Sequence, residues 1–334
     1  MKNTINYSKP QISTHLLSML LIFVLSFFTF SCSTEEVVSL DDTSQAFSIV
    51  EVLKNYESST ISTASKSKDK KEKKPTFKTL SVALAKTNLA GTVSSNQLTV
   101  FAPTDAAFAK YGLDQKNIGS FPGIKDILLY HAVAGKVFST DLSNGFVPTL
   151  NGAAVEVKMD DSGVMINSSN VIIANIEARN GVIHAVDDIL FPPTQNLVAL
   201  ASSNPQFSVL LAAATKAELA GVLMGDGPYE QLTVFAPTNQ AFIDFLGVST
   251  VDEAIEVVNS LTKEDLAPIL LYHVVEGRVY SSDLSSGPVT TLNGDFDLNM
   301  DTLKINDSAM LDVNLLNIQA TNGVIHVIKA VLVP

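Results

Sequence analysis

Two stretches of this chain carry nearly the same eleven residues. "LTVFAPTDAAF" occupies residues 98–108 and "LTVFAPTNQAF" occupies residues 232–242, with nine of the eleven positions identical. A phrase that recurs alone can be a site, whereas a series of phrases that recurs in one order indicates a repeated domain. The rest of the sequence decides between these two interpretations.

Three further pairs of segments recur in the same order along the chain. The pairs are residues 75–93 with 205–223, 128–143 with 270–285, and 180–186 with 322–328. A length of 334 residues is also what about two ordinary domains require. We therefore predict two copies of one module, domain 1 over residues 43–194 and domain 2 over residues 195–334.

Each copy predicts helices that alternate with short strands. "LTVF" is a run of β-forming residues that a proline ends, and Thr104 or Thr238 then suits the N-cap of a following helix. "FKTLSVALAKTNLAG" predicts a helix that stops at Gly91. "NG" at 180–181 and 322–323 predicts a tight hairpin, because Asn and Gly accept positive φ. The strands "VIHAV" and "VIHVI" that follow are apolar on both faces and are therefore expected to be buried.

The series "TVFAPT..AF", "LYH.V.G.V.S.DL" and "NGVIHV" resembles the fasciclin domain family and covers nearly all of residues 43–334 in two copies. The resemblance implies an α+β fold of two tandem fasciclin-type domains, each a β-sandwich or wedge with packed helices. It also implies adhesion or surface interaction rather than catalysis. One departure is that copy one keeps the Asp often found after the last motif, as Asp187, where copy two has Lys329.

The start of the chain resembles an export signal. Residues 16–30 are mostly apolar but shorter than the roughly 20 residues that span a bilayer, which favours a signal peptide over residues 1–31. "TFSC" resembles a bacterial lipobox, with Thr29 at the usual Leu position, and this implies lipid on Cys32. An ordinary signal peptide with an incidental cysteine is the alternative.

With a lipid on Cys32, residues 32–42 are expected to form a flexible tether. The expected location is then the bacterial cell envelope, where the lipid would hold the protein on the outer membrane. The sequence leaves open whether the protein lies on the periplasmic or the outer face of that membrane. The expected partners are the membrane, through the lipid, and an extracellular polysaccharide or surface protein, with self-association as a further possibility.

Composition narrows the classes of partner. The formal net charge of −12 argues against nucleic acid, whose phosphates would be repelled. A Lys- and Ser-rich stretch at about 57–74 interrupts domain 1 and predicts a basic, disordered insertion, either a solvated loop or a contact for an anionic polymer. The single cysteine excludes a disulfide framework within the chain.

The histidines beyond the signal peptide all lie in repeated motifs. His184 and His326 alternate with valine or isoleucine and are predicted to be structural, buried and hydrogen-bonded. The remaining two histidines each follow a tyrosine, and these Tyr-His segments form a candidate adhesion surface: Tyr130, His131, Tyr272 and His273. The family resemblance links the matching segment to integrin-dependent adhesion in animal relatives.

No motif of the sequence predicts catalysis, a cofactor or a metal. "HExxH" and a Gly-x-Ser-x-Gly elbow are absent, and no acidic ligand stands at a suitable spacing from the histidines. We therefore expect a non-enzymatic adhesion or binding protein. The alternative is a carrier of an apolar small molecule such as a carotenoid or lipid, because some fasciclin-type proteins bind carotenoids.

Overall fold

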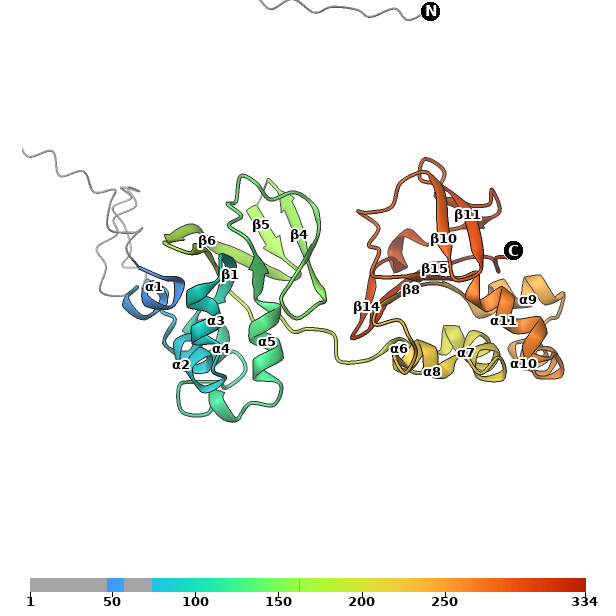
Figure 1. The fold of residues 1–334 in the computed structure, drawn as a ribbon, viewed down its shortest axis with the longest axis horizontal. Coiled ribbons are helices and arrows are strands. Elements are labelled where there is room, and N and C mark those ends of the chain that lie inside the picture. The colour runs from blue at the N-terminus through green and yellow to red at the C-terminus, as the bar shows by residue number, and fades with distance from the viewer. Residues whose placement is uncertain (1–46, 57–73, 162) are drawn as a thin grey trace, which may run out of the picture. The chain divides into compact units, whose positions relative to one another are not determined.

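A computed structural model describes residues 47–56, 74–161 and 163–334 (Figure 1). The predicted signal peptide, Cys32, the tether and nearly all of the basic insertion lie outside these residues.

Domain 1 mixes short helices and strands. Its helices are α1 (Ile49–Asn55), α2 (Lys78–Lys86), α3 (Ala90–Ser95), α4 (Asp105–Ala109), the 3-10 turn η2 (Ile118–Ser120) and α5 (Ile124–Tyr130). Its strands are β1 (Leu98–Pro103), β2 (Ala132–Ala134), β3 (Gly145–Pro148), β4 (Ala154–Asp160), β5 (Gly163–Ile166), β6 (Ser169–Ala178) and β7 (Gly181–Val186).

Domain 2 repeats most of this order. Its helices are α6 (Leu197–Ser203), η3 (Pro205–Phe207), α7 (Ser208–Lys216), α8 (Ala220–Met224), α9 (Asn239–Leu246), α10 (Val251–Ser260), α11 (Lys263–Leu271) and η4 (Val313–Leu315). Its strands are β8 (Leu232–Pro237), β9 (Val274–Glu276), β10 (Gly287–Thr291), β11 (Gly294–Asn299), β12 (Lys304–Ile305), β13 (Ala309–Met310), β14 (Ile318–Ala320) and β15 (Gly323–Ile328).

Both domains are built around the same central pairing. β1 runs parallel to β7 and antiparallel to β2, and β8 runs parallel to β15 and antiparallel to β9. Domain 1 extends this pairing into one seven-stranded sheet of order β2-β1-β7-β6-β5-β4-β3, whereas domain 2 has two four-stranded sheets. The difference arises because η4 interrupts the counterpart of β6, leaving β13 and β14 in separate sheets. The predicted α+β class is confirmed.

The central strands are covered on both faces. Val100 of β1 packs against the helices, while Phe101 faces the hairpin strands β4 and β5. Val234 and Phe235 divide in the same way in β8. In each domain the helices gather on one side of these strands and the hairpins on the other (Figure 1). A strand between two apolar layers is buried on both faces, which is why the motif does not alternate between apolar residues and exposed polar ones.

The doubled phrase is a strand-to-helix junction, as predicted. The Thr104 hydroxyl accepts a hydrogen bond from the Ala107 N–H at 3.1 Å and so caps α4. The next residue, Asp105, accepts from the Thr79 N–H at 2.7 Å, which supplies α2 with the side-chain cap that Phe77 cannot give. Seven identical letters followed by Asp or Asn therefore encode the packing of two helices.

The helix predicted over residues 77–91 ends earlier than predicted. α2 stops at Lys86, and Asn88 turns the chain with a φ of 58°. Gly91, the predicted stop, lies inside α3. Asparagine tolerates the left-handed conformation better than most residues, so it ends the helix three residues before the glycine.

The hairpin at "NG" is present, but for a different reason. Ala178 pairs with Gly181 across a two-residue turn, and neither Asn180 nor Gly181 adopts a left-handed φ. A Cβ at Gly181 would lie 1.8 Å from the carbonyl oxygen of Leu98 on the parallel neighbour β1. The glycine is required by this close approach of two backbones, which a sequence does not display.

Among the described residues, no single helix has the length and apolar character to cross a membrane. One bent pair, Leu197–Ser203 with Pro205–Lys216, meets the criteria of length and composition together, with a bend of 107° between its halves.

Candidate functional site

The Tyr-His segment of domain 1 lies where α5 runs into β2. The side chain of Tyr130 is 2% exposed and that of His131 is 1% exposed. The Nδ1–H of His131 donates to the Ile127 carbonyl at 2.7 Å, since a carbonyl can only accept. Nε2 then accepts from the Leu190 N–H at 3.0 Å. The ring thus joins the last turn of α5 to the segment after β7.

Domain 2 builds the same joint from its own copy. His273 donates from Nδ1 to the Ile269 carbonyl at 2.8 Å and accepts at Nε2 from the Leu332 N–H at 2.9 Å. Burial lowers the pKa of His131 and of His273 to about 4, with the hydrogen bonds to the helix carbonyls opposing the shift. Both rings are therefore neutral near pH 7.

The neighbouring tyrosines reach the opposite layer. The Tyr130 hydroxyl donates to the Ala154 carbonyl at 2.7 Å and accepts from Nδ2 of Asn167 at 3.2 Å. Tyr272 repeats this with the Asp295 carbonyl at 2.8 Å and Asn306 at 3.1 Å. Each Tyr-His pair thus fastens a helix, a hairpin and the exit of the last strand together.

This burial bears on the candidate adhesion surface. Tyr272 and His273 are 5% and 1% exposed, as closed off as their domain 1 counterparts. A ligand on the outside of this fold would rest on other residues, and the Tyr-His pairs could support binding only by holding that surface in shape. That binding depends on Tyr130, His131, Tyr272 and His273 stays a prediction.

The second histidine of each domain lies on a central strand, His184 on β7 and His326 on β15, and both side chains are buried. His184 donates from Nε2 to the Val137 carbonyl at 3.0 Å, and its Nδ1 lies 3.4 Å from the Asn175 N–H. His326 makes the matching bond to the Val279 carbonyl at 2.8 Å. Burial lowers the pKa of both imidazoles. All of these ring nitrogens face backbone groups, which leaves none free to ligate a metal.

The "S.DL" motif forms a turn beside this histidine. Ser139 and Asn175 exchange two hydrogen bonds of 2.8 Å, one through the Ser139 N–H and one through its hydroxyl. Asp141 accepts from the Phe138 N–H at 3.2 Å and closes the turn. The serine hydroxyl contacts an amide rather than an imidazole, so this segment does not assemble a nucleophile and base.

Among the described residues, no group of three or more His, Cys, Asp or Glu side chains is placed to hold a metal ion. Asp187, the acid that copy two lacks, accepts from the Asn170 N–H at 2.8 Å and from the Ser169 hydroxyl at 3.1 Å. Burial alone would raise the pKa of Asp187, but these hydrogen bonds outweigh it and hold that pKa below its usual range. In this structure Asp187 fastens β6 to the end of β7.

Sequence reasoning missed an exposed aromatic pair in domain 1. Tyr111 and Phe191 are 46% and 43% exposed, and their rings meet edge to face at 5.1 Å. A hydrogen bond to Asp188 raises the pKa of Tyr111, and Lys110 pairs with the same carboxylate at 3.1 Å. The two aromatics stand far apart in sequence, one after α4 and one after β7, so no local pattern signals the pair.

Sequence reasoning also missed an apolar cavity in domain 2. It has a volume of about 50 Å³ and lies among α6, α7, α8, α11 and the strands β8, β9 and β15. A void of this size in a packed core costs about 1 kcal/mol of stability. The signal was present as small residues, since Ala201 and Ala214 line the cavity.

Comparisons with known proteins agree on one family. Residues 75–192 and 205–334 each match the Fasciclin domain. "Protein sll1483" of Synechocystis is 38% identical over 141 residues, covering 41% of this chain and 73% of that protein. Transforming growth factor-beta-induced protein ig-h3 of Sus scrofa is 27% identical over 246 residues, covering 71% of this chain. The match spans only 34% of that relative's length.

Among solved structures, the chain is similar to a FAS1 domain pair from the insect cell adhesion molecule fasciclin I. The sequence identity is 18% and the TM-score is 0.35, over 77% of this chain and 96% of the insect chain.

Proposed function

Because this chain belongs to the fasciclin domain family, in two tandem copies, we propose that it is a non-enzymatic adhesion or binding protein of the cell envelope. Its ligand would be a matrix polysaccharide or a surface protein. The polar groups of the Tyr-His and "S.DL" motifs form hydrogen bonds within the domain. The proposed contacts with the ligand therefore come from side chains outside the motifs.

The observation that carries the proposal is the Tyr111–Phe191 pair. Aromatic side chains supply large contact area at low entropic cost and dominate many binding surfaces. Here the carboxylate of Asp188 accepts a hydrogen bond from Tyr111, and the two rings meet edge to face. An exposed aromatic face of this kind suits a sugar ring or an extended peptide.

A binding screen tests this proposal. The mature tandem would be assayed against envelope polysaccharides and matrix proteins, beside Tyr111→Ala with Phe191→Ala. We expect the double variant to lose at least tenfold in affinity. Phe245→Ala is the matched control, because Phe245 of α9 is also 46% exposed but belongs to the other domain. Equal binding by the double variant and the wild type would refute the assigned surface.

We propose in addition that a lipid on Cys32 holds the protein on the outer membrane, on the strength of the "TFSC" segment. Several acyl chains on one residue bind a membrane far more firmly than one. Cys32→Ala should move the protein from the membrane fraction to the soluble fraction. Membrane association that survives this substitution would contradict the lipid anchor.

The second candidate function is carriage of an apolar small molecule, such as a carotenoid or lipid. The cavity of domain 2 favours it, because an apolar lining accepts hydrocarbon and offers no partner to a polar group. Organic extraction of gently purified protein followed by mass spectrometry tests it. A stoichiometric apolar compound in the extract would support carriage, and an empty extract would count against it.

A further inference from the structure

Two buried leucines of the domain 1 core have alanine counterparts in the lining of the domain 2 cavity. α1 and α6 begin at matching places, since the Ile49 N–H donates to Asn180 and the Leu197 N–H donates to Asn322. In this alignment Leu53 of α1 corresponds to Ala201 of α6.

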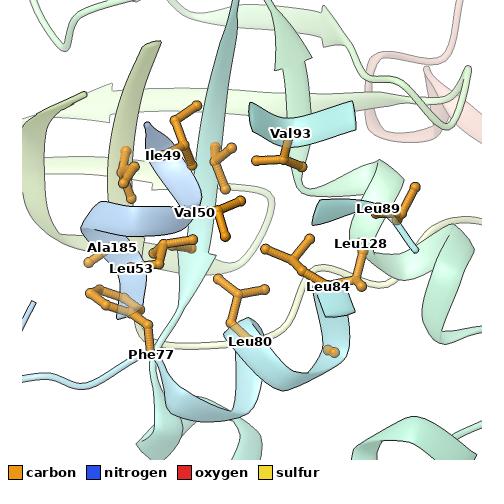
Figure 2. Packing of buried hydrophobic residues seen from close by; sticks show 14 of the residues in the cluster. Ile49, Val50, Leu53, Phe77, Leu80, Leu84, Leu89, Val93, Leu128 and Ala185 are labelled. Atoms are coloured by element: carbon orange, nitrogen blue, oxygen red, sulfur yellow. The ribbon is translucent and has the colours of Figure 1, made fainter. Parts of the chain in front are cut away.

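The second replacement lies on the next helix. α2 and α7 both follow a buried phenylalanine, and in that alignment Leu84 of α2 corresponds to Ala214 of α7. Figure 2 shows Leu53 and Leu84 among the packed side chains of the domain 1 core. Methyl groups in place of two isobutyl groups on these neighbouring helices leave room at the cavity of domain 2.

The helical layer around the cavity is also looser than its counterpart. Val50, Leu80, Leu89 and Val93 are buried in domain 1. The matching residues of domain 2 are all half-buried: Val198, Leu210, Leu219 and Leu223. These four residues line the cavity, so its walls reach the solvent between the helices. A ligand would enter there without disturbing the sheet.

A further change removes an aromatic cover. In domain 1 the ring of Tyr56 packs on Phe77 at 5.2 Å, edge to face. Its counterpart Asn204 instead accepts from the Gln206 N–H at 3.0 Å and caps η3. Phe207 therefore lines the cavity without the ring that covers Phe77.

The lining determines the chemistry of the occupant. It consists of aliphatic side chains and Phe207, with His273 as its one titratable member. Both nitrogens of His273 are already bonded to backbone groups. No lining side chain offers a free polar partner, so the buried part of a ligand must be hydrocarbon.

The size of the cavity narrows the shape of that hydrocarbon. A volume of about 50 Å³ exceeds the roughly 10–15 Å³ that one water molecule needs and falls short of the engineered cavity of about 150 Å³ that takes benzene. A ring does not fit without opening the helices. The narrow end of a straight chain needs less room than a ring, and its remaining methylenes would lie along the half-buried leucines.

We propose that domain 2, and not domain 1, binds the methyl end of an acyl chain in the cavity that Ala201 and Ala214 leave open. The polar head of the acyl chain stays in water outside the α6–α8 layer. This assignment rests on the second candidate function, carriage of an apolar molecule, and names its site and ligand class.

Calorimetry with dodecanoate, below its micelle concentration, tests the site on the mature tandem. We expect one dodecanoate per chain. Ala214→Leu and Ala201→Leu each restore a domain 1 residue, and each should weaken binding at least tenfold. Ala199→Leu is the matched control, because it adds the same volume to α6 at a residue outside the lining. The two filling variants are independent, so one that fails to fold leaves the other as a test.

The outcomes separate the site from the broader function. Unchanged dodecanoate binding by both filling variants, or two dodecanoates per chain, would overturn the assigned site while carriage stands. An extract that holds a ring-containing compound, with no dodecanoate binding, would overturn the acyl chain alone. An empty extract together with no dodecanoate binding would overturn both.

Discussion

Leu190 donates its backbone N–H to Nε2 of His131 at 3.0 Å, and Leu332 makes the same bond to His273 at 2.9 Å. In each domain this bond ties the exit of the last strand to the helix that carries the Tyr-His pair. The repeated histidine is therefore a connector between two segments that are distant in sequence, and its chemistry as a neutral ring is what the connection requires.

His131→Ala should destabilise domain 1 by about 2–4 kcal/mol, because it leaves a void and an unpaired buried N–H on Leu190. Urea unfolding would measure the change. Domain 2 is the internal control, since its own His273 joint is untouched. A loss of less than about 0.5 kcal/mol would mean that the imidazole does not hold the two segments together.

Stability should fall with acid between about pH 6.5 and pH 4. The pKa of His131 and of His273 is about 4 in the folded chain and near 6.5 in the unfolded chain, so the unfolded chain binds more protons in this window. The stabilisation is complete above pH 6.5 and is lost as the pH falls toward 4. Its size is on the order of 3 kcal/mol for each ring.

Unfolding free energies measured at half-unit steps of pH would show this slope. His131→Ala should reduce this slope between pH 4 and 6.5, because one buried ring with a lowered pKa is gone. His184 and His326 keep their own contributions to the slope, since burial lowers their pKa as well. Asp105 and Asp187 have folded pKa values below their usual range, so their contributions are lost at lower pH and do not mask the histidines. A slope that the variant leaves intact would contradict this assignment.

Gly181→Ala should destabilise domain 1 by more than about 3 kcal/mol, since the new Cβ would lie 1.8 Å from the Leu98 carbonyl oxygen and only backbone movement could relieve the clash. Gly91→Ala is the control, because that glycine lies in α3 with no atom within 4 Å of the added Cβ. The control should be neutral or stabilised by up to about 1 kcal/mol. Similar effects of the two substitutions would refute the close-approach explanation of Gly181.

Structural features that depend on residues close together in the sequence could be predicted from it. Thr104 caps α4 through the Ala107 N–H three residues away, and β7 is buried along its length as its apolar run indicates. It did not reveal why Gly181 is glycine, because the clashing carbonyl of Leu98 comes from another strand. The predicted helix end at Gly91 was wrong, because Asn88 already turns the chain with a φ of 58°.

The sites depended still more on three-dimensional proximity. Tyr111 and Phe191 come into contact only through the tertiary fold. Neither local segment therefore predicts an exposed aromatic pair. Ala201 and Ala214 are common helix residues. Their place in the cavity lining is noticed only when domain 2 is compared with domain 1, which has buried leucines at the matching positions.

Asn175→Ala should cost more than Asn175→Gly. Asn175 has a φ of 60° and bonds to Ser139 through its side chain while its N–H points at His184. Glycine loses the side-chain bonds but accepts the left-handed backbone, whereas alanine loses the bonds and adds about 1–2 kcal/mol of strain. Thermal melts of the two variants would separate the backbone contribution from the hydrogen bonds. Equal melting temperatures would show that the left-handed turn is not held by this residue.

Leu84→Ala should convert the core of domain 1 toward that of domain 2. The leucine is buried in the cluster of Figure 2, so its loss should cost about 2–5 kcal/mol, from lost burial and from the void left behind. Ala214→Leu should have the opposite sign, because it fills an existing cavity worth about 1 kcal/mol, less any strain of fitting the larger side chain. Chemical denaturation of both variants measures the two signs. A destabilised Ala214→Leu domain 2 would mean that the helices have already closed around the smaller residue, and that the space is too narrow for an added isobutyl group.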